Sequence, residues 1–86
     1  MASLLLVEDD PGVAELLALA LRSLGHRTRI AADGESALAA VTEEPFDAMV
    51  LDVMMPGIDG FETCRRLRAS SQLPVIMVTA RSEAID

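Results

Sequence analysis

Acidic side chains stand at two places in this chain where they could hold a metal ion. Glu8, Asp9 and Asp10 follow directly after the apolar run 4–7, and Asp52 follows a second apolar run at 48–51. Short apolar runs without alternation are typical of strands that are covered on both faces of a parallel sheet. Sites in such sheets lie beyond the carboxyl ends of the strands. These acidic groups are therefore the first candidates for chemistry.

The chemistry that they predict is the binding of a divalent metal ion beside a phosphate. If the two strands are neighbours, about 4.8 Å apart, Glu8, Asp9 and Asp52 converge on one small volume. Oxygen anions this close repel each other unless a hard divalent cation lies among them. Mg²⁺ is favoured over Ca²⁺ where few protein ligands leave room for water and a phosphate. Phosphoryl transfer requires little beyond such a metal, good positioning and a few dipoles.

Each candidate residue taken alone has a simpler explanation. Asp9 or Asp10, just before Pro11, could cap a helix, and Asp52 could be an ordinary loop residue. Thr79, after a further apolar run, could be a β-branched residue that only fills a strand end. The combination carries the hypothesis, because three predicted strands each end in a residue suited to phosphate chemistry.

Alternating strands and helices must position these side chains. Strands are predicted at 4–7, 26–31, 47–51 and 74–78, and helices from Pro11 to a stop at Gly25, at 35–44 and at 61–69. The strand at 26–31 alternates, with Arg27 and Arg29 on one side, which favours a more exposed edge position. This β-α-β alternation predicts a parallel sheet with right-handed crossovers.

Apolar residues at helical spacing predict which helix faces are buried. The first helix is expected to bury Val13, Leu16, Leu17, Ala20, Leu21 and Leu24, the second Ala37, Leu38 and Val41, and the third Phe61, Cys64 and Leu67. Cys64 is therefore expected to be a small buried hydrophobic residue and not a redox thiol.

Composition limits the remaining classes of function. Eighty-six residues make one domain, and with 51% hydrophobic but only 2% aromatic residues its core must be aliphatic. A formal net charge of −7 argues against nucleic-acid binding by this segment. Without a long apolar run or a signal-like start, the expected location is the cytoplasm.

Three segments resemble the receiver domains of two-component response regulators. They are Leu-Leu-Val-Glu-Asp-Asp at 5–10, Met-Val-Leu-Asp-Val-Met-Met-Pro-Gly-Ile-Asp-Gly at 49–60 and Val-Ile-Met-Val-Thr-Ala at 75–80. The match runs in order through nearly the whole chain. It implies an α/β, flavodoxin-like doubly wound parallel sheet with strand order 2-1-3-4, in which residues 1–86 form one receiver domain.

The resemblance also implies a role for each site residue. Asp52 would accept the phosphoryl group from a sensor histidine kinase. Asp9 would bind Mg²⁺ directly, Glu8 through water, and Met54 through its backbone carbonyl. Thr79 would donate a hydrogen bond to a phosphoryl oxygen. Such a domain is a phosphoacceptor rather than an enzyme, and the parent protein would control transcription through a DNA-binding output.

The chain departs from the family pattern at its carboxyl end. It stops after the fourth predicted strand, before the family's fifth strand and last two helices, and it contains no lysine to pair with the phosphoryl group. Arg81 is not an equivalent group, because its planar fork differs from an ammonium point charge. Asp10, at a variable acidic position, is expected to cap the first helix.

Two consequences and two alternatives follow from this departure. Phosphate stabilisation is expected to be weaker, and the exposed strand at 75–78 is expected to cause self-association by edge pairing or by exchange of elements between copies. The main alternative is a self-associating interaction module, derived from a receiver domain, that is not phosphorylated. A Mg²⁺ phosphatase is disfavoured, because Asp52-Val53-Met54 lacks a second aspartate.

Overall fold

Strands and helices alternate along the chain as expected. The computed structural model describes residues 1–52 and 60–78, with the backbone alone at residues 52 and 78. The elements are β1 (Ser3–Val7), α1 (Pro11–Ser23), β2 (Arg27–Ala31), α2 (Gly34–Glu43), β3 (Ala48–Asp52), α3 (Gly60–Arg68) and β4 (Val75–Val78). Each predicted strand and helix is present, with small shifts at its ends.

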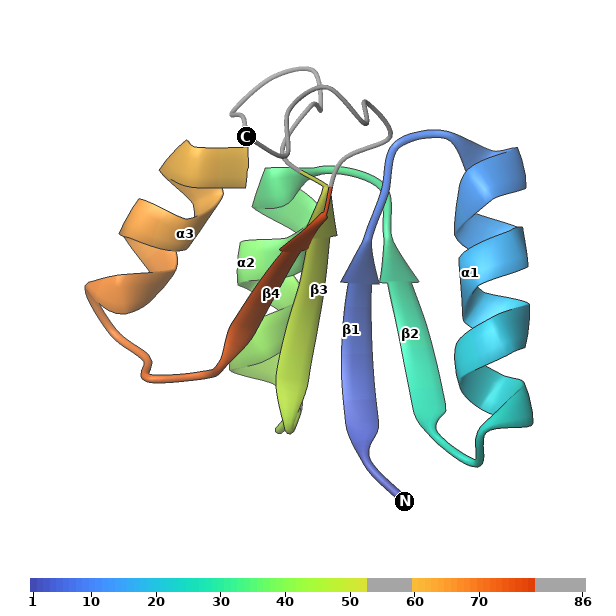
Figure 1. Ribbon diagram of the computed structural model, residues 1–86. Helices are drawn as coiled ribbons and strands as arrows, with labels where there is room; N and C mark the ends of the chain where they lie inside the picture. The colour runs from blue at the N-terminus through green and yellow to red at the C-terminus, as the bar shows by residue number, and fades with distance from the viewer. Residues whose placement is uncertain (53–59, 79–86) are drawn as a thin grey trace.

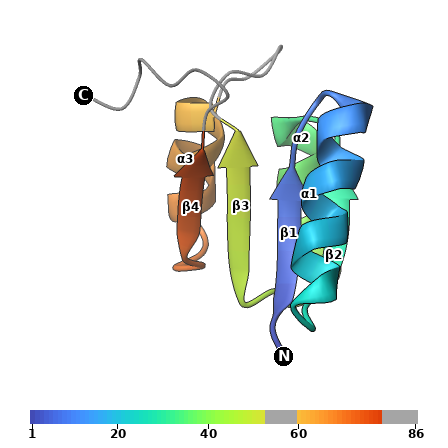
Figure 2. The same ribbon diagram turned by 45° about the vertical axis from the view of Figure 1, so that its right-hand side comes forward.

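The four strands form one parallel sheet in the order β2-β1-β3-β4 (Figure 1). Helix α1 lies on one face of the sheet, and α2 and α3 lie on the other (Figure 2). This arrangement confirms the predicted strand order and the edge position of β2. All four strands run in the same direction, so their carboxyl ends meet along one edge.

The main core lies between the sheet and the pair α2 and α3. Alternate strand residues point toward these helices because successive side chains of a strand face opposite sides. The buried cluster consists of Leu5, Val7, Ala31, Ala37, Ala40, Met49, Leu51 and Leu67. Leu38 and Val41 of α2 pack against it, which confirms the predicted inner face of that helix.

Helix α1 buries a different face from the one expected. Ala14 and Ala18 are its buried residues. Of the predicted face, Leu17 and Leu21 are half-buried, whereas Val13, Leu16, Ala20 and Leu24 are exposed. The helix is apolar around most of its circumference, so hydrophobic spacing alone does not select one face. The small alanine side chains let the helix backbone come close to the sheet.

Helix α3 also differs in part from the prediction. Gly60, Thr63 and Leu67 form its buried face, and Cys64 is half-buried against the core. Phe61, expected to point inward, is 66% exposed. Counting back from Leu67 by four residues gives Thr63, and by a further three gives Gly60. The polar Thr63 therefore lies on the buried face of the helix, where Phe61 was expected.

Side chains from two loops hold the amino end of β1. The Ala2 N–H donates to His26 Nδ1 at 3.1 Å, and the Ser3 N–H donates to Asp47 Oδ2 at 2.6 Å. Asp47 in turn donates its own N–H to the Ser3 carbonyl at 2.6 Å. These bonds hold the amino end of β1 beside the residues that precede β2 and β3.

The described helices are too short or too polar to cross a lipid bilayer.

Candidate functional site

The register between β1 and β3 brings the two acidic segments to one edge of the sheet. The paired positions run from Leu4 with Ala48 to Val7 with Leu51. Adjacent strands are about 4.8 Å apart. The next position along each strand therefore sets the backbone of Glu8 beside that of Asp52. The predicted adjacency of the first and third strands is confirmed.

Glu8 is a buried carboxylate at this edge. The residue is only 7% exposed. Its backbone N–H donates to the Ala31 carbonyl of β2 at 3.0 Å, and its Oε2 accepts the N–H of Asp10 at 3.2 Å. A buried carboxylate is costly unless it is hydrogen-bonded, paired or bound to a metal. Its position therefore fits an oxygen ligand held at a cation site.

Asp9 has the opposite environment. It is exposed, and within residues 1–52 and 60–78 no hydrogen bond or ion pair involves its carboxylate. A carboxylate that is not engaged in the fold is available to a metal or to water. Glu8 and Asp9 thus offer oxygen atoms of the kind that Mg²⁺ prefers.

Asp10 caps α1, as expected. Its Oδ1 accepts the N–H of Gly12 at 2.9 Å and that of Val13 at 3.3 Å, which satisfies two of the free donors at the start of the helix. The bond from the Asp10 N–H to Glu8 was not predicted, because sequence spacing does not report the orientation of a turn.

Part of the predicted site lies outside the described residues. This applies to Met54, to Thr79 and to the side chain of Asp52, whose backbone alone is described at the end of β3. Among the side chains that the structure does describe, no three acidic, histidine or cysteine groups gather as a metal site. The described half of the site is the one that β1 supplies.

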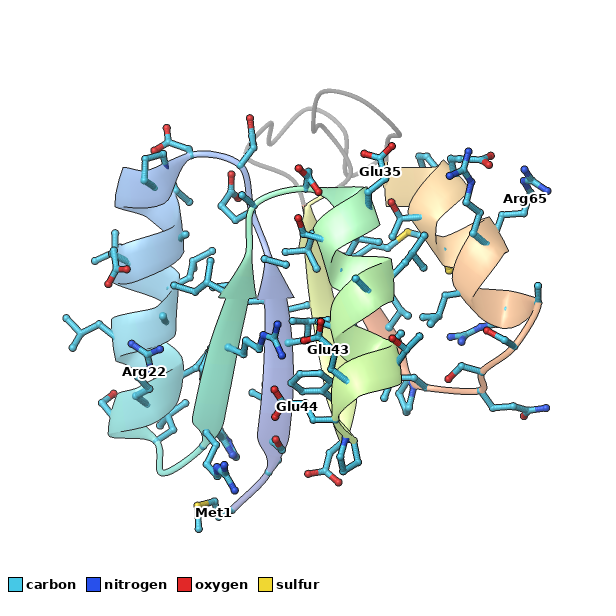
Figure 3. All side chains as sticks on the ribbon, turned by 180° about the vertical axis from the view of Figure 1, so that it is seen from behind. Met1, Arg22, Glu35, Glu43, Glu44 and Arg65 are labelled. Atoms are coloured by element: carbon cyan, nitrogen blue, oxygen red, sulfur yellow. The ribbon has the colours of Figure 1, made fainter. Side chains whose placement is uncertain are left out.

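A hollow of about 260 Å³ lies at the opposite end of the sheet. Ser3, Arg27, Arg29, Glu44 and Phe46 line it. Arg29 forms ion pairs with Glu43 at 2.8 Å and with Glu44 at 2.6 Å, and these bonds raise its pKa. The charge of Arg29 is thus paired within the fold. Figure 3 shows the two ends: Met1 at the lower end, and Glu35 at the upper, carboxyl end.

Comparisons with known sequences extend these findings. The family model described as response regulator receiver domain matches residues 4–86. The transcriptional regulatory protein AfsQ1 of Streptomyces coelicolor is 54% identical over 86 residues, which are 100% of this chain and 38% of that protein. The DNA-binding response regulator MtrA of Mycolicibacterium smegmatis is 45% identical over 83 residues, 96% of this chain and 36% of that protein. The chain thus spans less than two fifths of these relatives.

Solved structures agree with the sequence comparison. The response regulator TrrA of Thermotoga maritima, in complex with Mg²⁺-BeF, matches with a TM-score of 0.90 and 34% identity, over 99% of this chain and 75% of that one. The receiver domain of the Francisella response regulator 1452 matches with a TM-score of 0.87 and 29% identity, over 98% and 72%. With this sheet order and these matches, the chain belongs to the response regulator receiver domain family.

Proposed function

We propose that Asp52 accepts a phosphoryl group from a sensor histidine kinase in a Mg²⁺-dependent reaction. The observation that carries this proposal is the parallel register of β1 and β3, which sets Glu8 beside Asp52. In the transfer, an Asp52 carboxylate oxygen forms a bond to phosphorus while the bond from phosphorus to the donor histidine nitrogen breaks. The products are an aspartyl phosphate on this chain and a free histidine on the kinase. The phosphorylated aspartate is the signal that the chain carries, so the chain acts as a signalling domain.

The proposed metal ligands come from both strands. Asp9 binds Mg²⁺ directly, Glu8 binds through water, and Asp52 and the Met54 carbonyl complete the protein ligands. The bound metal offsets repulsion between the anionic donor and the anionic acceptor. Support comes from the buried Glu8 and from Asp9, whose carboxylate has no partner among the described residues. Further support comes from TrrA, which was solved with Mg²⁺-BeF.

Thr79 is proposed to donate a hydrogen bond to the transferred phosphoryl group. Its place in the sequence directly after β4, whose Val78 pairs with Asp52, supports this proposal. A phosphoryl group adds charge and strong acceptor oxygens, which draw in donors of this type. The hydroxyl then links phosphorylation to a change between two conformations.

For the parent protein we propose a role in transcription. AfsQ1 is named a transcriptional regulatory protein, and MtrA is named a DNA-binding response regulator. This chain covers only the part of those proteins that matches the receiver family. Its net charge of −7 disfavours direct contact with nucleic acid, so DNA binding is assigned to another part of the parent. The cytoplasmic location stays a prediction.

The test is the intact mass of the chain after incubation with acetyl phosphate. With Mg²⁺ the wild type is expected to gain one phosphoryl group, and with a chelator it is expected to gain none. Asp52→Asn is expected to abolish the gain. Glu15→Gln, which removes the charge of an exposed acid on α1, is the matched control and is expected to be phosphorylated like the wild type. An equal gain in Asp52→Asn, or no gain in the wild type, would contradict the proposal.

A self-associating interaction module is the second candidate function, and β4 is the observation that favours it. In the described sheet β4 is an edge strand, with Ile76 56% exposed and Met77 also exposed. An edge strand with apolar side chains is a template for pairing with another strand. The occupant proposed here is a second copy of the chain, through edge pairing or exchange of elements.

A further inference from the structure

We propose that Asp10 is a positioning residue of the metal site, which fixes the Glu8 carboxylate through its own backbone amide. This inference rests on the proposed Mg²⁺ site at Glu8, Asp9 and Asp52. It assigns to Asp10 a role beyond capping the helix. Asp10 itself does not touch the metal in this proposal and acts only through Glu8.

The contacts of Asp10 face two ways. Toward the helix, its Oδ1 accepts the N–H groups of Gly12 and Val13, and its carbonyl accepts the Ala14 N–H at 2.8 Å. Toward the sheet, its own N–H donates to Glu8 Oε2 at 3.2 Å. The residue is therefore anchored to the first turn of α1 at three points while its amide holds the carboxylate.

This anchoring matters because Glu8 has a flexible side chain. A free glutamate samples several rotamers, and binding a metal requires one of them. A ligand that is already held in place loses less conformational freedom when the metal binds. The cap fixes the backbone at position 10, with φ −83° and ψ 114°, and this fixes the direction of the N–H. Loss of the cap side chain would let the turn move and remove this hydrogen bond from the carboxylate.

A matched residue separates this role from ordinary capping. Asp33 caps α2 in the same way, with Oδ1 accepting the Ser36 N–H at 2.7 Å. In the described part of the chain, however, no hydrogen bond runs from the Asp33 amide to a carboxylate. Asp33→Ala should therefore weaken a helix cap without disturbing Glu8. Asp10→Ala should do both.

The experiment is calorimetric titration of the whole chain with Mg²⁺, alongside thermal unfolding. Asp10→Ala is expected to raise the Kd for Mg²⁺ by about fivefold to tenfold, near the lower end of the effect of groups that orient metal ligands. Asp10→Asn keeps a capping oxygen and is expected to stay within about twofold of the wild type. Asp33→Ala is expected to lower the unfolding temperature and to leave the Kd unchanged.

Loss of the negative charge is a competing explanation for weaker Mg²⁺ binding in Asp10→Ala. Asp10→Asn also lacks this charge and therefore tests that explanation. If Asp10→Asn weakens binding as much as Asp10→Ala, the lost charge is responsible and the positioning role is overturned. If Asp33→Ala weakens binding equally, general loss of stability is responsible. A wild type that does not bind Mg²⁺ overturns the metal site itself, and the positioning role with it.

A second measurement needs no metal. The temperature coefficient of the residue 10 amide proton, measured by NMR, is expected to be that of a hydrogen-bonded group in the wild type and in Asp10→Asn. In Asp10→Ala it is expected to become that of an amide bonded to water. An unchanged coefficient in Asp10→Ala would show that the cap does not hold the amide against Glu8, and would overturn the proposal.

Discussion

Val7 of β1 and Leu51 of β3 are paired in parallel register. One residue further along both strands, this pairing sets Glu8 beside Asp52. The elements α1, β2 and α2 separate the two acids widely in sequence. In the sheet, however, β3 lies directly beside β1, on the side opposite β2. The proposed metal site depends on this single neighbour relation, since a strand inserted between β1 and β3 would separate the acids by about 10 Å.

Asp9→Asn is expected to weaken Mg²⁺ binding by at least about tenfold with little effect on folding. The side chain is exposed and unengaged within the described residues, so the free energy of unfolding should change by less than about 0.5 kcal/mol. Calorimetry measures the first effect, and urea unfolding followed by circular dichroism measures the second. Glu15→Gln, an exposed acid further along α1, is the control. Wild-type affinity in Asp9→Asn would refute its role as a direct ligand.

The buried face of α1 predicts opposite results for two neighbouring apolar positions. Ala18→Leu is expected to destabilise the fold by about 1–3 kcal/mol, because the larger side chain has to enter a packed contact with the sheet. Leu16 is 67% exposed, so Leu16→Ala should change stability by less than about 0.5 kcal/mol. Urea unfolding of both variants is the measurement. A larger loss for Leu16→Ala would mean that the helix buries its leucine stripe instead.

Glu62 is expected to make the fold sensitive to acid. Hydrogen bonds from Arg65 and Arg66 lower the pKa of this carboxyl from 4.5 to about 2. Because the pKa is lower in the folded state, the stabilisation is complete above pH 4.5 and is lost as the pH falls toward about 2. Urea unfolding at a series of pH values should therefore show a shallower loss of stability in Glu62→Gln across this window than in the wild type.

The same carboxyl offers a direct control by NMR titration. Replacing both Arg65 and Arg66 with glutamine should raise the pKa of Glu62 toward its ordinary value, because both hydrogen-bond donors are removed. Arg68→Gln is the matched variant, since Arg68 donates to the Ser71 carbonyl instead. Its effect on the pKa of Glu62 should be small. Equal shifts in the two variants would mean that general helix charge, and not hydrogen bonding, lowers this pKa.

Self-association through β4 is expected to appear at high protein concentration. Sedimentation should show species heavier than the 9.2 kDa chain, and Ile76→Lys should abolish them, because a charge on an edge strand opposes pairing with a second copy. Leu19→Lys, on the exposed side of α1, is the control and should leave association intact. A wild type that is monomeric at every concentration would remove the second candidate function.

The sequence alone determined the order and type of the elements. Apolar runs, Pro11, Gly25 and the acidic turn after Val7 are local signals, and each marks an element or an end that the structure contains. Gly25 has a φ of 93°, a conformation that favours glycine. The place before Pro11 indicated a cap at Asp9 or Asp10, the resemblance favoured Asp10, and the structure confirms Asp10. The segments around Asp52 also indicated the family, which the comparisons confirmed.

Only the tertiary structure decided which faces meet and how the site is held. The periodicity of α1 permitted several buried faces, and contact with the sheet selected Ala14 and Ala18, since small side chains allow the closest approach. The burial of Glu8 depends on how the end of β1 meets β2, where the Glu8 N–H donates to the Ala31 carbonyl. A local pattern cannot report these features, because they arise from contacts between residues far apart in the chain.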